Sequence, residues 1–318
     1  MRLKLVLTLL GWVLATGCIE QVDQLWFQPD PLTAYSWPAN EVPESRIEEV
    51  ELQGSALAEE QAPTLFGVWL HPCEDSSPQD CPPNDEYDRA NRETTVLYLH
   101  GGRGNLESHW ARLQILWRMG FAIFAVDYRG YGRSTGSPSE AGLYLDARSA
   151  LNHVLEQLAA AGAEQLPRPE LSRVIYYGHS LGGAVAIDLA SEFNPSLLIT
   201  ESSIVSAQAL VDDALGLGLP AGTLMSSEFD AIAKIPFVTA PKLVLHGTED
   251  ILVRFEFAQL LYQAASEPRK LVAIAGADHN NLPCPSQAAP TPGADSSCIA
   301  SPSYLAELNS FIEEFLAP

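Results

Sequence analysis

A serine at the apex of a predicted sharp turn is the residue in this sequence best placed to do chemistry. The segment 178–182 reads Gly-His-Ser-Leu-Gly and puts Ser180 between two glycines. An apolar run at 173–177 precedes it, and residues 184–193 carry apolar side chains at helical spacing. A strand, a tight turn and a helix in this order expose the hydroxyl at a strained position and place the Leu181 amide at a helix N-terminus. We therefore expect Ser180 to be a nucleophile and Leu181 to donate to a developing oxyanion.

A serine hydroxyl needs a base within hydrogen-bond reach, and the base needs an acid that orients it. Asp250 follows a predicted buried strand at 242–246, and His279 follows the next one at 270–274. Because both lie at the carboxyl ends of successive strands, in the chain order serine, acid, base, we expect them to meet Ser180. Two rival acids remain open, namely Glu249 and Asp278.

A second oxyanion donor is expected in the loop that follows the strand ending at Leu99. This loop reads His-Gly-Gly-Arg at 100–103, and the amide of Gly102 is the preferred donor, with Arg103 the next choice. Glycine lets the backbone approach a substrate carbonyl, although these glycines could also serve only a tight turn. Two histidines that end predicted strands are interpreted as packing or hydrogen-bonding residues, His100 and His246. We expect neither a metal nor a cofactor.

Short apolar runs alternate with segments of helical periodicity over most of the chain, which predicts an α/β fold with a mostly parallel central sheet and helices on both faces. The expected parallel strands are 94–99, 121–126, 173–177, 197–200, 242–246 and 270–274. The expected helices are 108–119, 139–161, 184–193 and 304–315. Early antiparallel strands are expected at 48–52 and 65–70. The segment 201–240 has no clear strand and is expected to form a short cap.

The chain resembles the α/β-hydrolase superfamily over about residues 45–318, and most of all its membrane-associated branch of depalmitoylases and lysophospholipid or monoacylglycerol lipases. The segments that carry the resemblance are 100–102, 124–134, 136–140, 178–183, 201–202, 246–250 and 278–280. The resemblance implies the α/β-hydrolase fold and a triad of Ser180 as nucleophile, Asp250 as acid and His279 as base. Two cysteine-bearing insertions depart from the branch and leave the substrate open.

The first 17 residues have the layout of an export signal, with a basic start at 1–4 and an apolar run ten residues long at 5–14. A run of this length is too short to span a bilayer. The Gly-Cys pair ending at Cys18 also resembles the lipobox of bacterial lipoproteins. We expect an exported protein that a lipidated Cys18 anchors at the cell envelope, on the periplasmic face of an outer membrane or at the cell surface. Simple signal cleavage and a buried Cys18 are the alternatives. Residues 18–44 are expected to be a tether that ends by packing on the domain.

Four further cysteines suit an exported protein, and they are Cys73, Cys81, Cys284 and Cys298. Sequence alone leaves their pairing open, and free thiols are the alternative. Local pairs, Cys73 with Cys81 and Cys284 with Cys298, are favoured because both intervals are polar and rich in Pro, Ser and Asp. The formal net charge of −22 disfavours nucleic acid and anionic membranes as partners.

Three functions remain open from the sequence. The leading one is hydrolysis of carboxylic esters or thioesters with acyl-lipid-like or small acyl groups. The second is an aminopeptidase-like activity on the same fold, with a free α-amine bound by acidic cap residues, Asp212, Asp213, Glu228 and Asp230. The third is a catalytically silent surface binding protein. Apolar cap residues such as Phe229 either line an acyl groove or pack the cap onto the sheet, and the oligomeric state is open.

Overall fold

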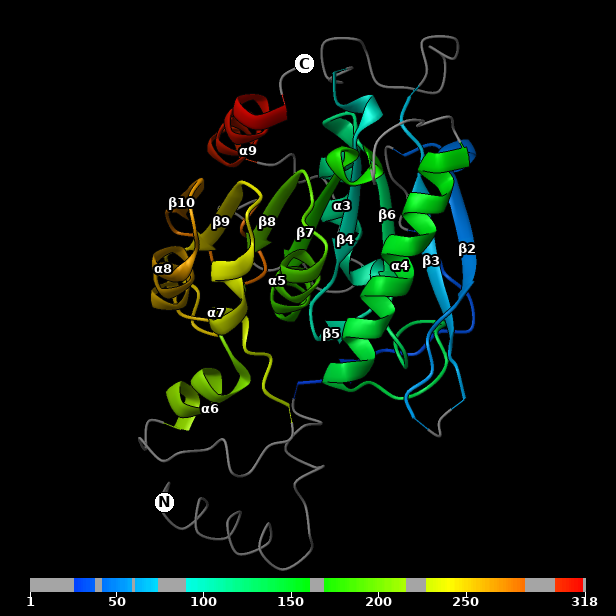
Figure 1. The fold of residues 1–318 in the computed structure, drawn as a ribbon, viewed down its shortest axis with the longest axis horizontal. Helices are drawn as coiled ribbons and strands as arrows, with labels where there is room; N and C mark the ends of the chain where they lie inside the picture. Colours follow the sequence, from blue (N-terminus) through cyan, green and yellow to red (C-terminus); the bar gives the residue numbers. More distant parts are fainter. Residues whose placement is uncertain are drawn as a thin grey trace, which may run out of the picture.

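The main sheet of this protein is mostly parallel (Figure 1). The computed structural model describes residues 26–37, 42–58, 61–73, 90–160, 169–215, 227–283 and 301–316. Within these ranges the sheet has eight strands in the order β10-β9-β8-β7-β4-β6-β3-β2. Neighbours from β6 to β10 pair in parallel, whereas β3 pairs antiparallel with both β6 and β2. The predicted sheet, including its early antiparallel strands, is confirmed.

The observed elements lie within two residues of most expected ones. The strands are β2 (Ile47–Gln53), β3 (Thr64–Leu70), β4 (Thr95–Leu99), β6 (Ala122–Asp127), β7 (Val174–His179), β8 (Leu197–Glu201), β9 (Lys242–Gly247) and β10 (Arg269–Ile274). The helices are α3 (Trp110–Arg118), α4 (Glu140–Ala160), α5 (Leu181–Glu192), α6 (Ala207–Leu215), α7 (Ala231–Lys234), α8 (Phe255–Ala264) and α9 (Pro302–Leu316). The helix α8 was not among the expected elements.

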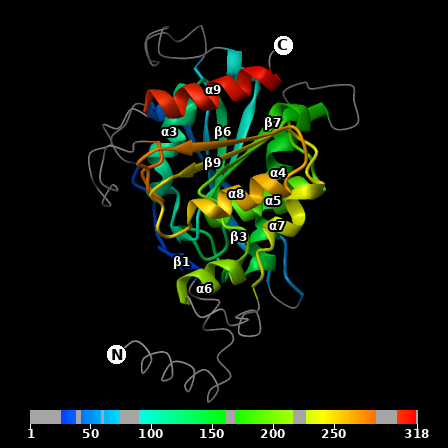
Figure 2. The same ribbon diagram turned by 90° about the vertical axis from the view of Figure 1, so that its left-hand side faces the viewer.

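Different helices cover the two faces of the sheet, as Figure 2 shows. The helices α4, α5 and α8 pack on one face, and α3 and α9 pack on the other. Side chains of β4 alternate between the two layers: Leu97 and Leu99 join the first, while Val96 and Tyr98 join the second. Burial on both faces explains why the central strands read as continuous apolar runs.

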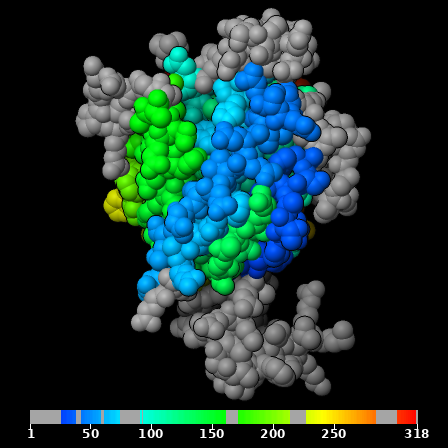
Figure 3. Space-filling model, turned by 90° about the vertical axis from the view of Figure 1, so that its right-hand side faces the viewer, coloured from blue at the N-terminus to red at the C-terminus, as the bar shows by residue number. Residues whose placement is uncertain are grey.

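The N-terminal segment 26–37 runs along the domain surface beside β2 and β3 (Figure 3). Its strand β1 (Gln28–Pro29) pairs in parallel with β5 (Arg103–Gly104). The amide of Gln28 also donates to the carbonyl of Gly102, with 2.7 Å between nitrogen and oxygen. Residues 26–37, which belong to the expected tether, therefore pack on the domain and fix the loop that carries the expected second oxyanion donor.

The expected cap at 201–240 is described in part. It contains α6 and α7, and residues 216–226 lie outside the described ranges. Phe229 is fully buried, with its ring centroid 6.1 Å from that of Phe27 and 5.8 Å from that of Tyr144. This aromatic residue thus packs the cap onto the domain.

The expected export signal and four of the five cysteines, Cys18, Cys81, Cys284 and Cys298, lie outside the described residues. Cys73 is buried just after β3. Lipidation and disulfide pairing therefore stay predictions. No helix in the described part of the chain is both long enough and apolar enough to cross a membrane.

Candidate active site

The turn that carries Ser180 is as sharp as the sequence predicts. Ser180 has φ 56° and ψ −120°, a left-handed conformation that side-chain-bearing residues rarely adopt. A Cβ atom on Gly182 would lie 2.1 Å from the carbonyl oxygen of Leu99, and one on Gly178 would lie 2.2 Å from that of Gly182. Only glycine therefore allows β7, α5 and β4 to approach so closely beneath the serine.

The three side chains of the predicted triad lie in one hydrogen-bonded line. The Ser180 Oγ lies 3.0 Å from His279 Nε2, and His279 Nδ1 lies 2.8 Å from Asp250 Oδ2. Since a carboxylate only accepts, Nδ1 carries the proton and Nε2 is left as the acceptor for the serine hydroxyl. The rival Glu249 is exposed, and the Asp278 carboxylate accepts the backbone amides of the two residues after His279. Asp250 is thus the carboxylate that contacts the imidazole.

The surroundings of Asp250 keep it ionised. Its Oδ1 accepts the amides of Leu252 and Val253, each at 2.9 Å, and its Oδ2 lies 3.3 Å from His246 Nε2. Burial alone would raise the pKa of Asp250, but hydrogen bonds from His246, His279 and the Val253 amide lower this pKa well below its usual range. The sequence analysis did not predict that His246 contacts Asp250. The position of His246, at the end of β9 and four residues before Asp250, could have suggested this contact.

The two expected oxyanion donors lie beside the serine turn. Leu181 is the first residue of α5, so its amide has no acceptor one helical turn earlier. The glycine loop packs on the turn: a Cβ on Gly101 would lie 3.3 Å from Ser180 Cβ, and one on Gly102 would lie 3.1 Å from Leu181 Cδ2. Among the described residues, no backbone acceptor is found for the Leu181 or Gly102 amide.

Three buried imidazoles, tilted or edge-on to one another, form a row behind the base. Ring centroids are 5.3 Å apart for His279 and His179, 5.4 Å for His179 and His109, and 5.4 Å for His109 and His100. Burial lowers the pKa of His179 and of His109, and the nearby charge of Arg112 lowers both further. Both rings are therefore neutral near pH 7. In the described part of the chain, no cluster of His, Cys, Asp and Glu could hold a metal ion.

Sequence comparisons match part of this chain to a known family. A model described as the alpha/beta hydrolase family matches residues 96–232. The human alpha/beta hydrolase domain-containing protein 17B is 31% identical over 208 residues, which cover 64% of this chain and 63% of that protein. The Escherichia coli protein YfhR is 29% identical over 193 residues, covering 59% of this chain and 64% of that protein. The match thus spans a little under two thirds of the length of each of these relatives.

Solved structures share the same fold at low sequence identity. An esterase from Pyrococcus furiosus superimposes with a TM-score of 0.61 at 17% identity, over 92% of this chain and 98% of that chain. An esterase domain from Rhodothermus marinus gives a TM-score of 0.51 at 20% identity, over 85% of this chain and all of that chain. At such low sequence identity, these superpositions show a shared fold and nothing about activity. The family match over residues 96–232, the sequence relatives and the α/β-hydrolase fold all point to the α/β-hydrolase superfamily.

Proposed function

We propose that this chain is a serine hydrolase that cleaves carboxylic esters or thioesters, with acyl-lipid-like or small acyl groups, through an acyl-enzyme. The observation that carries the proposal is the line from Ser180 Oγ to His279 Nε2 at 3.0 Å and from His279 Nδ1 to Asp250 at 2.8 Å. The superfamily and its esterase-like fold support a hydrolase. The buried acid and the two amides for which the described residues offer no backbone acceptor support acyl transfer in particular.

In the first half-reaction, Ser180 Oγ attacks the substrate carbonyl while His279 Nε2 takes the hydroxyl proton. The carbonyl electron pair moves to oxygen, and the amides of Leu181 and Gly102 donate to that oxyanion. Asp250 accepts a hydrogen bond from Nδ1–H of His279 and stabilises the imidazolium. When the tetrahedral intermediate collapses, the alkoxide or thiolate leaves with the proton from Nε2, and the acyl group stays on Ser180.

In the second half-reaction, water replaces the leaving group. His279 Nε2 takes a proton from the water as its oxygen attacks the acyl carbon, and the same two amides bind the new oxyanion. Collapse then breaks the bond to Ser180 Oγ, which recovers its proton from His279. The product leaves as a carboxylic acid and the enzyme is restored.

A fluorophosphonate probe is expected to label the wild-type chain and not Ser180→Ala, because the probe phosphonylates only an activated serine. The kcat/KM values for a chain-length series of p-nitrophenyl esters, beside the matching thioesters, would then define the acyl group and the leaving group. Ser196→Ala is the matched control, since its hydroxyl donates to the Val174 carbonyl at the start of β7, far along the strand from Ser180. Absence of label from the wild type, or equal label on Ser180→Ala, would contradict the proposal.

The peptidase alternative needs free acidic groups in the cap. Asp213 is ion-paired with Arg254 at 2.5 Å, and Asp230 accepts the amide of Ala233 at 3.2 Å, so two of the four candidate carboxylates already have partners. Aminoacyl anilides assayed beside the esters separate the two activities. Turnover of the anilides alone would favour the peptidase, and neither turnover nor label would favour a silent binding protein.

We also propose that the mature protein is anchored at the cell envelope through lipidated Cys18. Mass analysis of the mature chain is expected to show residue 18 at the N-terminus with diacylglycerol and acyl groups attached, and Cys18→Ser is expected to lose that mass and move to the soluble fraction. A mature chain that starts elsewhere, or an unmodified Cys18, would argue for simple secretion or a structural cysteine.

A further inference from the structure

We propose that Arg112 is a positioning residue for the base His279, whose loop it holds through the carbonyl of Asn280. The inference rests on the serine-hydrolase function proposed above. Arg112 lies on α3, on the face of the sheet opposite α5, and is 9% exposed. A charge so deeply buried is costly unless it is paired and hydrogen-bonded.

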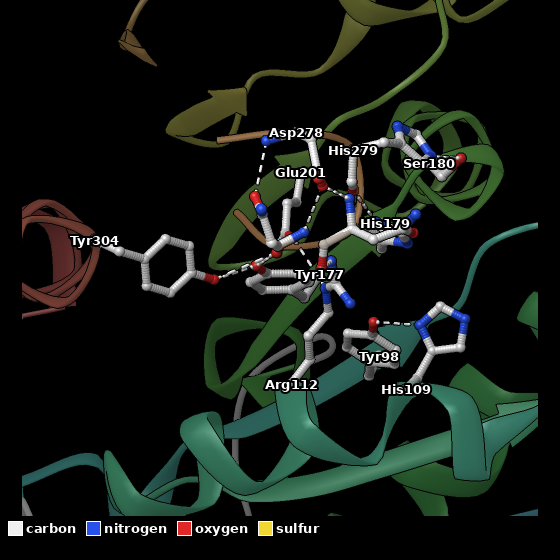
Figure 4. Close-up of polar contacts among 12 residues, drawn as sticks. Tyr98, His109, Arg112, Tyr177, His179, Ser180, Glu201, Asp278, His279 and Tyr304 are labelled. Carbon is white, nitrogen blue, oxygen red and sulfur yellow. Dashed lines mark hydrogen bonds and ion pairs between the residues drawn. The ribbon is translucent and has the colours of Figure 1, made fainter. Parts of the chain in front are cut away.

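Within the described part of the chain, Arg112 makes two side-chain hydrogen bonds, and each reaches a different part of the site. Its Nε donates to Glu201 Oε1 at 2.9 Å, and its Nη2 donates to the Asn280 carbonyl, also at 2.9 Å. Figure 4 shows Arg112 pointing from α3 into the polar centre below His279. Burial opposes the charge of Arg112, but the Glu201 carboxylate raises the pKa of the guanidinium. A permanently charged donor therefore faces the peptide that directly follows His279.

The loop of the base is held at His279 and at the two residues that follow it. His179 Nε2 donates to the carbonyl of His279 at 3.2 Å, so two consecutive carbonyls of the loop are bound by buried side chains from β7 and α3. The Asp278 carboxylate accepts the amides of Asn280 and Asn281 at 2.8 and 3.0 Å. These contacts involve the loop backbone and leave the imidazole of His279 to bond with Ser180 and Asp250.

Glu201 links this contact to the serine turn. Its backbone carbonyl accepts the Ser180 amide at 2.8 Å, while its side chain binds Arg112. The hydroxyl of Tyr177 donates to the second carboxylate oxygen, and the Tyr304 hydroxyl lies 2.6 Å from that of Tyr177. Burial and the Glu201 charge raise the pKa of both tyrosines, which stay neutral donors. Glu201 thus joins the turn of the nucleophile, through its backbone carbonyl, to the loop of the base, through its carboxylate and Arg112.

The expected role of this link is geometric. Proton transfer needs His279 Nε2 near the 3.0 Å that separates it from Ser180 Oγ. Displacement of a catalytic group by about 1 Å can cost about 10²-fold in rate, even when the changed residue lies away from the chemistry. Lysine cannot replace Arg112 fully, because it is a point charge without the planar fork that spans a carboxylate and a carbonyl.

The test is a steady-state comparison of the full-length wild type, Arg112→Lys and Arg112→Ala on the ester with the highest kcat/KM. We expect kcat to fall by about 10²-fold in Arg112→Ala and by about tenfold in Arg112→Lys, with KM within about twofold in both, because acyl binding is untouched. Guanidinium chloride, well below the concentration that unfolds the protein, is expected to restore part of the kcat of Arg112→Ala. Urea at the same concentration should not.

The matched control is Arg129→Ala. Arg129 forms another buried ion pair, with Asp146 at 2.7 Å, and among the described residues this pair makes no bond to the loop of His279. Its melting temperature should fall while kcat stays within about threefold of wild type. The inference is overturned if Arg112→Lys keeps wild-type kcat, if the loss lies in KM, or if guanidinium rescues nothing. If Arg112→Ala does not fold, Arg112→Lys and Glu201→Gln decide by the same kcat criterion. A wild type that neither labels nor turns over esters overturns the proposed function instead.

Discussion

Ser180→Ala and His279→Ala are each expected to lower kcat by about 10⁶-fold, and the double variant is expected to lose no more than either single one. The hydroxyl and Nε2 lie 3.0 Å apart and act as one unit. Without the imidazole the hydroxyl keeps its proton, and without the hydroxyl the imidazole has nothing to activate. The KM values should change little, because neither side chain is expected to bind the acyl chain. The measurement is steady-state turnover of a p-nitrophenyl ester by each purified variant.

The control for this prediction is His153→Gln. His153 lies on α4, away from the serine turn, and its Nε2 accepts a hydrogen bond from the indole Nε1 of Trp69, with 3.0 Å between the two nitrogens. Its kcat should equal that of the wild type. Losses that multiply in the double variant, or a His279→Ala enzyme that keeps more than about a hundredth of wild-type kcat, would mean that the two side chains act separately.

The parallel strands could be predicted because burial on both faces makes each of them a short continuous apolar run. The elements that were missed lack such a signal. The strands β1 and β5 have two residues each, so they cannot show a strand period. The helix α8 begins after Arg254, whose side chain makes no capping hydrogen bond, and no capping residue marks its start in the sequence. Its place is set by packing against β9 and β10, which is a tertiary property.

The meeting of Ser180, Asp250 and His279 could be predicted because each of them follows a strand, and parallel strands bring their carboxyl ends to one edge. The residues that support them could not. Arg112 and Asn280 are separated by 168 positions, and nothing local to either one indicates a contact. A charged residue on the buried side of α3 is a signal that some carboxylate must pair with it, but a single sequence does not say that this is Glu201.

Asp250→Asn is expected to lower kcat by about 10⁴-fold with little change in KM. An amide in place of the carboxylate favours the tautomer of His279 that carries its proton on Nε2. In that tautomer Nε2 cannot accept a hydrogen bond from the Ser180 hydroxyl. Burial would raise the pKa of Asp250, but His246, His279 and the Val253 amide hold this pKa far below its ordinary range. The carboxylate is therefore charged throughout the pH range of an ester assay. Any fall in the kcat of the wild type at low pH in this range does not come from protonation of Asp250.

The same depressed pKa has a consequence for stability. A carboxylate with a lowered folded-state pKa stabilises the fold above its unfolded pKa of about 3.9, and this contribution is lost as the pH falls toward the folded value. The difference in unfolding free energy between wild type and Asp250→Asn, from urea titrations, should therefore be largest above about pH 5 and shrink below about pH 4. A difference that does not depend on pH would show that the native carboxylate is not stabilised by its hydrogen bonds.

Comparing the kcat of Glu249→Gln with that of Asp250→Asn tests whether Asp250 is the carboxylate that assists His279. Glu249 is exposed and adjacent in sequence, and its substitution removes the same charge from the same loop. If the long-range negative charge of the loop mattered to His279, the two variants would lose similar amounts of kcat. If the hydrogen bond from Nδ1 matters, only Asp250→Asn loses activity, since the 2.8 Å contact belongs to Asp250 alone among the carboxylates of that loop described here. A larger loss in Glu249→Gln would transfer the role of the acid to that residue and would require the loop to rearrange when substrate binds.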